Sequence, residues 1–325
     1  MTQNQAVDPA LGEQALPARR AGFVHGHFPR HKGRVIAVSA LIGFLLTVVW
    51  SAEFVDHVIG DSVANTILGH DAKATPITGV LAGTLFAFVS GLAGTFTACN
   101  IAAFGAVAPL LGDNAGRGER VRRALPPLGW LSAGMLAVSV VYGALVGLVG
   151  TGMPQFATTR VPGTIPGFLV QSMVVYGLIG LFMLWLGLAA AGVARDPLGP
   201  LTRRWPNAPM VVMGVLIGLF LVGRPYPLFR QMFRDAAESG NPLYGAAAFS
   251  LQSIGNIIVL AVLFLALTYF LGARMQRWLS AEPTRTAKIT AVSLVSAGVF
   301  LVLYWDVRLL QFLDLISWYP VAPWT

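Results

Sequence analysis

The sequence is poor in charge. Only 11% of its 325 residues are Asp, Glu, Lys or Arg, whereas 55% are hydrophobic. A soluble domain carries about 25% charged residues, so this composition excludes an ordinary soluble protein. The one cysteine, Cys99, excludes an internal disulfide. The chain also has no Walker loop, no zinc-ligand spacing and no hydrolase triad, and we expect neither a metal nor a cofactor.

Long apolar runs take the place of the missing charge. Runs of about 20 apolar residues suit transmembrane helices, and they predict an all-α polytopic protein in a lipid bilayer. Residues 1–33 are polar and lack the apolar core of a cleaved signal peptide, which predicts a disordered tail. The net charge of +8 does not imply nucleic acid, because basic residues of membrane proteins gather on the cytoplasmic side.

Hydropathy predicts about seven transmembrane helices, two of them interrupted. The interruptions fall at Cys99 and at the Pro-Tyr-Pro sequence near residue 226. The predicted ranges are 35–54, 76–111, 128–150, 167–193, 210–227, 243–272 and 289–305.

The distribution of Lys and Arg predicts the topology. Basic residues concentrate in the tail and in the loops 113–126, 194–208 and 274–288, whereas the loop 55–75 is acidic. By the positive-inside rule, the basic segments are cytoplasmic. We therefore expect a bacterial-type inner membrane protein with its N-terminus inside and its C-terminus outside.

The two interrupted segments predict an internal repeat. Gly91-Leu92 recurs as Gly218-Leu219, which aligns Cys99 with Tyr226. Three helices in each half force the halves into opposite orientations, as in inverted-repeat transporters whose site lies at broken helices. The predicted divisions are the tail 1–33, a leading helix and outer loop at 34–75, and three-helix halves at 76–194 and 195–325.

Around the first interruption, polar residues stand inside an apolar run. They are Thr97, Cys99 and Asn100, with Pro109 further on. A thiol at the start of a half-helix would have a lowered pKa and would favour the thiolate. The alternative is that Cys99 is a small packing residue among Gly and Ala.

The second interruption combines prolines with an arginine. Pro225 and Pro227 remove backbone donors on both sides of Tyr226 and break the helix. The Tyr226 hydroxyl could bond across the break, or the ring could simply pack. Arg224 beside it either marks a site or extends to the outer interface.

Helix 243–272 carries two amides on one face, Gln252 and Asn256. They could line a polar path, or they could hydrogen-bond neighbouring helices. No carboxylate is expected in mid-membrane, and Asp306 is predicted to mark the outer end of helix 289–305.

These features resemble a known family. TACNIAAFGAVAPLLG resembles the first break of the CcdA/DsbD-type cytochrome c biogenesis membrane proteins, of the LysE-like transporter superfamily, and GRPYPLFRQMF resembles the second. The resemblance covers about 76–305. It implies an inverted three-plus-three fold in which two membrane cysteines pass reducing equivalents from thioredoxin outward. This chain departs from that pattern, since Ala98 replaces the first proline and Tyr226 the second cysteine.

Three hypotheses remain. The resemblance implies a maturation factor for cytochrome c or another exported protein. Such a factor would act as a thiol–disulfide relay only if a thioredoxin-like or cysteine-bearing partner supplied the second thiol. The alternative is a LysE-like transporter of a small solute or ion that uses both breaks as its site. A structural subunit is the third.

Overall fold

The computed structural model describes residues 23–24, 28–51, 61–71, 74, 77, 79–93, 117–157, 165–224, 227–282 and 284–323. These residues form helices and no strand. The helices are α1 (Lys32–Val49), α2 (Asp61–Leu68), α3 (Val80–Ala93), α5 (Arg117–Val149), α6 (Gly167–Ala190), α7 (Gly199–Arg204), α8 (Ala208–Val222), α9 (Pro227–Glu238), α10 (Pro242–Phe270), α11 (Gly272–Ser280), α12 (Thr284–Val302), the π-helical turn η6 (Leu303–Arg308) and α13 (Leu309–Phe312), with 3-10 turns η4 (Gly150–Gly152) and η5 (Pro154–Phe156).

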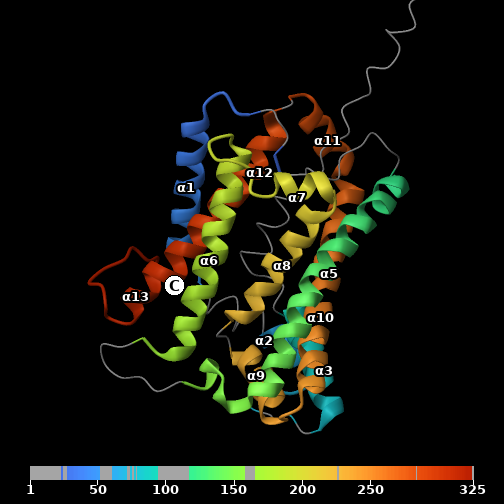
Figure 1. Cartoon of the computed structure of the whole chain (residues 1–325), viewed down its shortest axis with the longest axis vertical. Helices are drawn as coiled ribbons and strands as arrows, with labels where there is room; N and C mark the ends of the chain where they lie inside the picture. The colour runs from blue at the N-terminus through green and yellow to red at the C-terminus, as the bar shows by residue number, and fades with distance from the viewer. Residues whose placement is uncertain are drawn as a thin grey trace, which may run out of the picture.

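The long helices form one bundle with α8 near its centre (Figure 1). Five of them are long and apolar enough to cross a membrane: Lys32–Val49, Val121–Gly152, Gly167–Ala190, Pro242–Phe270 and Thr284–Gln311. Large apolar side chains cover the outside, and Leu148, Leu178 and Val262 are 70%, 64% and 60% exposed. Such a surface would be costly in water and suits lipid. The chain is therefore an all-α protein whose helices fit a bilayer.

Several predicted loops are partly helical, so those boundaries were wrong. The segment Arg117–Arg123 was expected in a loop but forms the first turns of α5. There the Glu119 carboxylate forms ion pairs with Arg122 at 3.2 Å and with Arg123 at 2.9 Å. Pairs at this spacing stabilise exposed helix. The short helices α2, α7 and α11 likewise lie in segments predicted as loops. Hydropathy detects spans, and it misses amphipathic helices that bury only one face.

Glycines sit where helices cross closely. Gly91 on α3 faces Gly255 on α10, and Gly134 on α5 faces Gly214 on α8. An added Cβ would overlap a backbone carbonyl oxygen in every case: that of Gln252 for Gly91, Phe88 for Gly255, Leu131 for Gly214 and Val211 for Gly134. Backbones this close leave no room for a side chain, which is how small residues join membrane helices.

The other helix pairs are also joined through glycines. Gly143 of α5 faces Gly245 of α10, and Gly180 of α6 faces Gly298 of α12. α1 packs on α12 at Gly43, where a Cβ would come within 2.6 Å of the Ser296 carbonyl oxygen. Glycine contacts therefore join α1, α12 and α6 to one another, and α3, α10, α5 and α8 to one another.

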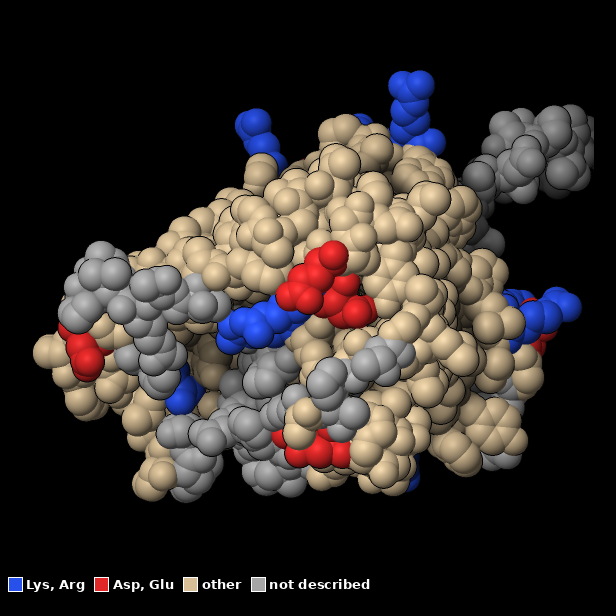
Figure 2. Space-filling view, turned by 90° about the horizontal axis from the view of Figure 1, so that it is seen from below, with Lys and Arg blue, Asp and Glu red and all other residues tan. Residues whose placement is uncertain are grey.

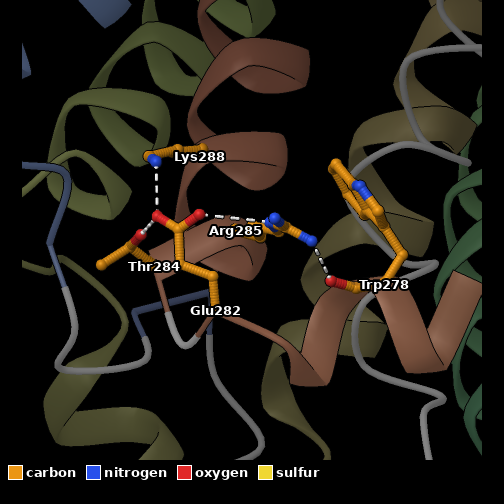
Figure 3. A network of polar contacts seen from close by, with 5 residues as sticks. All are labelled: Trp278, Glu282, Thr284, Arg285 and Lys288. Atoms are coloured by element: carbon orange, nitrogen blue, oxygen red, sulfur yellow. Dashed lines mark hydrogen bonds and ion pairs between the residues drawn. The ribbon is translucent and has the colours of Figure 1, made fainter.

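Basic residues gather at one end of the bundle, where α1, α5 and α12 begin and where α7 and α11 lie (Figure 1). Figure 3 shows the corner between α11 and α12. Glu282 accepts hydrogen bonds from Lys288 Nζ at 2.7 Å, from Arg285 Nε at 3.2 Å and from the Thr284 hydroxyl. Arg285 also donates to the Trp278 carbonyl at 2.7 Å, with its guanidinium 4.7 Å from that indole ring. This corner fixes the turn between the two helices.

The corner predicts an acid-sensitive contribution to stability. The bond from Lys288, followed by that from Thr284, lowers the pKa of Glu282 to about 2 from its ordinary 4.5. Because the folded-state pKa is depressed, the contribution is complete above about pH 4.5 and is lost as pH falls towards 2. In detergent, Glu282→Gln should therefore melt below wild type at neutral pH and converge with it in acid. Glu238→Gln, exposed at the other end, serves as control, and a difference that does not change with pH would contradict the argument.

Candidate functional site

α8 ends inside the bundle, and two side chains of α6 satisfy its last carbonyl groups. The Tyr176 hydroxyl donates to the Phe220 carbonyl at 3.1 Å, and Gln171 Nε2 donates to the Val222 carbonyl at 2.9 Å. The terminal carbonyls of a helix lack internal partners, and at membrane depth they must find them within the protein. The interruption between α8 and α9 is therefore stabilised by specific side chains.

Two amides next to this interruption have unused polar atoms. Gln171 Nε2 also donates to the Tyr142 hydroxyl at 2.9 Å, but its Oε1 is buried without a hydrogen bond. Gln155, in η5, is 3% exposed and makes no hydrogen bond through either amide atom. Its amide lies near the Tyr142 hydroxyl. Leaving buried polar atoms unpaired costs about 1–3 kcal/mol each, so this arrangement suits a polar ligand or water.

Arg230 adds a positive charge on the α9 side of the interruption, next to α6. It lies on α9, partly buried, with its guanidinium 5.1 Å from the ring centre of Phe168 on α6. Among the described residues it has no acidic partner; Asp235, on the same helix, accepts instead from the Tyr244 hydroxyl at 2.5 Å. Seen from the α9 end, basic and acidic side chains lie side by side near the middle of the face (Figure 2). We name Tyr142, Gln155, Gln171 and Arg230 the break site.

A second polar group lies where α3 meets α10. Gln252 is 1% exposed, and its Oε1 makes no hydrogen bond. Next to it, the Ser253 and Ser139 hydroxyls hydrogen-bond at 2.5 Å and join α10 to α5. Gly91, near the end of α3, packs directly on the backbone of Gln252 and Asn256. The backbone at these two positions therefore lies against the end of α3.

Many of the predicted site residues lie outside the described part of the chain. These are Thr97, Cys99, Asn100, Pro109, Pro225 and Tyr226. Arg224 and Pro227 flank the second interruption, since α8 ends at Val222 and α9 begins at Pro227. Gln252 is buried as expected. The structure thus places Arg224 and Pro227 along the chain between α8 and α9, and the backbone of Gln252 and Asn256 at the α3–α10 contact.

Sequence reasoning missed most of the break site. Tyr142 and Gln171 stand singly in apolar helices, and Gln155 lies in a short connection, so no spacing marked them. The only available signal was the rarity of glutamine in apolar segments.

Asp306, predicted to mark the outer end of helix 289–305, lies in η6, directly after α12. It lies within the apolar span Thr284–Gln311, with its Oδ2 atom buried and unbonded. Its carboxyl group therefore packs into the bundle near the end of this span, and the expectation that no carboxylate lies in mid-membrane stays a prediction.

The helices and the buried polar groups among them define an α-helical protein with several candidate membrane spans. Comparison with protein-family models, curated proteins and solved structures finds no match to this chain. Function must therefore be argued from the residues themselves.

Proposed function

We propose that this protein is a multi-pass membrane carrier of small anionic solutes, with its binding site at the interruption between α8 and α9. The observation that carries the proposal is Arg230, a partly buried cation whose described surroundings contain no carboxylate partner. Charged residues inside membrane bundles are costly and usually serve function. The N-terminus of α9 follows the interruption, and the N-terminus of a half-helix attracts anions.

The unused amide of Gln155 supports the same assignment. Its Nε2 is buried beside the Tyr142 hydroxyl and makes no hydrogen bond of ordinary geometry. A carboxylate or oxoanion would accept from this amide and from the Arg230 guanidinium, and charge-assisted bonds of this kind are the stronger ones. A cationic solute would find no described carboxylate at the break site. The chemistry therefore favours a small anion over a cation.

We infer an inverted repeat, with α3, α5 and α6 in one half, α8, α10 and α12 in the other, and α1 in front. The glycine crossings support it, because the α3–α10 contact uses the same backbone carbonyl contacts as the α8–α5 contact. Gly91 of α3 packs on the Gln252 carbonyl of α10, just as Gly214 of α8 packs on the Leu131 carbonyl of α5. In the reverse direction, Gly255 of α10 packs on the Phe88 carbonyl of α3, just as Gly134 of α5 packs on the Val211 carbonyl of α8. By these contacts, Gly91 is equivalent to Gly214 in the repeat. The sequence alone had suggested Gly218, which lies one helical turn later.

The proposed carrier crosses the membrane seven times. The shorter apolar helices α3 and α8 join the five longer spans as interrupted crossings. We assign the basic end of the bundle to the cytoplasm of a bacterial-type inner membrane, by the positive-inside rule. The N-terminus is then inside and the C-terminus outside.

Flux through proteoliposomes tests the proposal. The purified protein is offered chloride, nitrate, acetate and phosphate, with lysine and glycerol as cationic and neutral comparators. We expect carriage of at least one anion, reduced about tenfold or more in Arg230→Gln, because the loss of a buried charge contact costs more than about 1.4 kcal/mol. Arg234→Gln, exposed on the same helix, is the matched control and should retain the flux.

The outcomes separate the hypotheses. Carriage of lysine or glycerol alone, unaffected by Arg230→Gln, would show that the solute is not an anion. Absence of flux for every probe would remove the carrier assignment. Cys99→Ala should leave anion flux unchanged, since none of the described residues assigned to the break site carries a thiol.

The second candidate is a thiol-dependent maturation factor of the CcdA type. The packing of Gly91 on the backbone of Gln252 and Asn256 favours it, because α3 ends inside the bundle a few residues before Cys99 in the sequence. A single thiol cannot resolve its own mixed disulfide, so this function requires a cysteine-bearing partner. Trapping of Cys99 in a mixed disulfide in native membranes, together with loss of function in Cys99→Ala, would favour it over the carrier.

A further inference from the structure

We propose that Asp306 is a proton-binding site inside the bundle, separate from the break site. Asp306 lies in the π-helical turn η6, within the apolar span Thr284–Gln311. π-helical turns are rare and frequently occur at functional sites. The turn follows α12 directly and continues into α13, so Asp306 is held on a continuous helical segment.

The carboxyl group of Asp306 is packed without a hydrogen-bond donor. Its Oδ2 is buried and unbonded, and a Cβ added to Gly177 of α6 would lie 2.8 Å from that atom. The absent side chain at Gly177 is what admits the carboxyl group to the α6 surface. An ionised carboxylate buried without a partner is strongly unfavourable, and protonation removes the penalty.

The charged groups on the surrounding elements do not neutralise Asp306. Arg308, on the same turn, donates through Nη1 to the Thr47 and Trp50 carbonyls at 2.7 and 3.0 Å. On α6 the Tyr176 hydroxyl donates to the Phe220 carbonyl. α13 has no charged residue. The charged residues of α1 and α12 lie near the beginnings of those helices and are Lys32, Arg34, Arg285 and Lys288.

Protonation of Asp306 would be coupled to helix packing. The neutral acid fits against Gly177, whereas the carboxylate is drawn towards water and away from α6. Because part of Asp306 is exposed, the proton can exchange without unfolding. The site thus provides a protonation step next to the α6–η6 contact, whatever solute the protein carries.

Labelling with dicyclohexylcarbodiimide tests the proposal on the full-length protein in native membranes. The reagent adds to protonated carboxyl groups in apolar surroundings, and mass spectrometry localises the adduct. We expect a label on Asp306 that falls about tenfold between mildly acidic and mildly alkaline pH. The exposed Asp314 should remain unlabelled. No label on Asp306, or one that does not change with pH, would overturn the proposal.

Two variants sharpen the test. Asp306→Asn should remove the adduct from its peptide. Gly177→Ala should displace the carboxyl group towards water and reduce labelling, whereas Gly129→Ala, with nothing within 4 Å of its added methyl group, should label as wild type. Equal labelling of Gly177→Ala and wild type would contradict the packed position of the carboxyl group.

Discussion

Gly134→Leu is expected to prevent accumulation of the folded protein, whereas Gly129→Leu on the same helix should fold normally. The side chain at position 134 would be driven into the Val211 carbonyl of α8, a backbone atom that cannot rotate away. Overpacking of this kind costs about 1–3 kcal/mol even where neighbours can adjust, and here we expect about 3 kcal/mol or more. Gly129 is exposed and has nothing within 4 Å of the position that a Cβ would take, so its leucine would face lipid.

The pair of glycine variants controls for helix propensity. Both replacements raise intrinsic helix propensity by about the same amount, up to about 1 kcal/mol, so the difference between them reports packing alone. The measurements are the yield of monodisperse protein after size-exclusion chromatography in detergent and the midpoint of thermal unfolding. Equal behaviour of the two variants would mean that α5 and α8 do not cross at Gly134.

Arg308→Met is expected to destabilise the protein by about 3 kcal/mol or more. Arg308 donates to the Thr47 and Trp50 carbonyls at the end of α1, and hydrogen bonds from a charged group contribute about 1.5–3 kcal/mol each. Loss of the guanidinium would leave both carbonyls without this donor at the edge of the bundle. The thermal midpoint in detergent measures the effect.

Two further variants interpret that result. Arg204→Met removes an exposed arginine at the basic end and should change the midpoint little. Arg308→Lys should be intermediate, because a point charge replaces a planar fork that reaches two carbonyls. If Arg308→Met and Arg204→Met melt together, the contact with α1 does not contribute to stability.

The prediction of an all-α protein with membrane-compatible helices is confirmed, because long apolar runs have few alternatives to spanning helices. It misjudged boundaries where helices are short or amphipathic. α9 is such a case: it buries Phe229, Met232 and Phe233, whereas Arg234 is exposed and Arg230 is partly buried against Phe168. A hydropathy window averages the apolar and the charged residues of such a helix, so the helix is not detected.

The break site was less accessible to sequence reasoning for a different physical reason. The interruption itself could be predicted, because Pro225 and Pro227 cannot continue a helix, and α8 ends at Val222 while α9 begins at Pro227. Gln155 and Gln171 join the site only through tertiary packing, by way of the Tyr142 hydroxyl. Asp306 was assigned by position alone, and only the close approach to Gly177 shows that its carboxyl group turns into the bundle.

The glycine crossings have a mechanical consequence. α3 packs on α10 and α5 packs on α8, so the first helix of each proposed half is fastened to the second helix of the other. The halves are thus interlocked and cannot rock apart as two rigid bodies. Any large movement would instead separate the α1–α12–α6 group from the α3–α10–α5–α8 group. The Tyr176 and Gln171 bonds from α6 to the end of α8 cross that boundary, so opening the boundary would expose the carbonyls beside the break site.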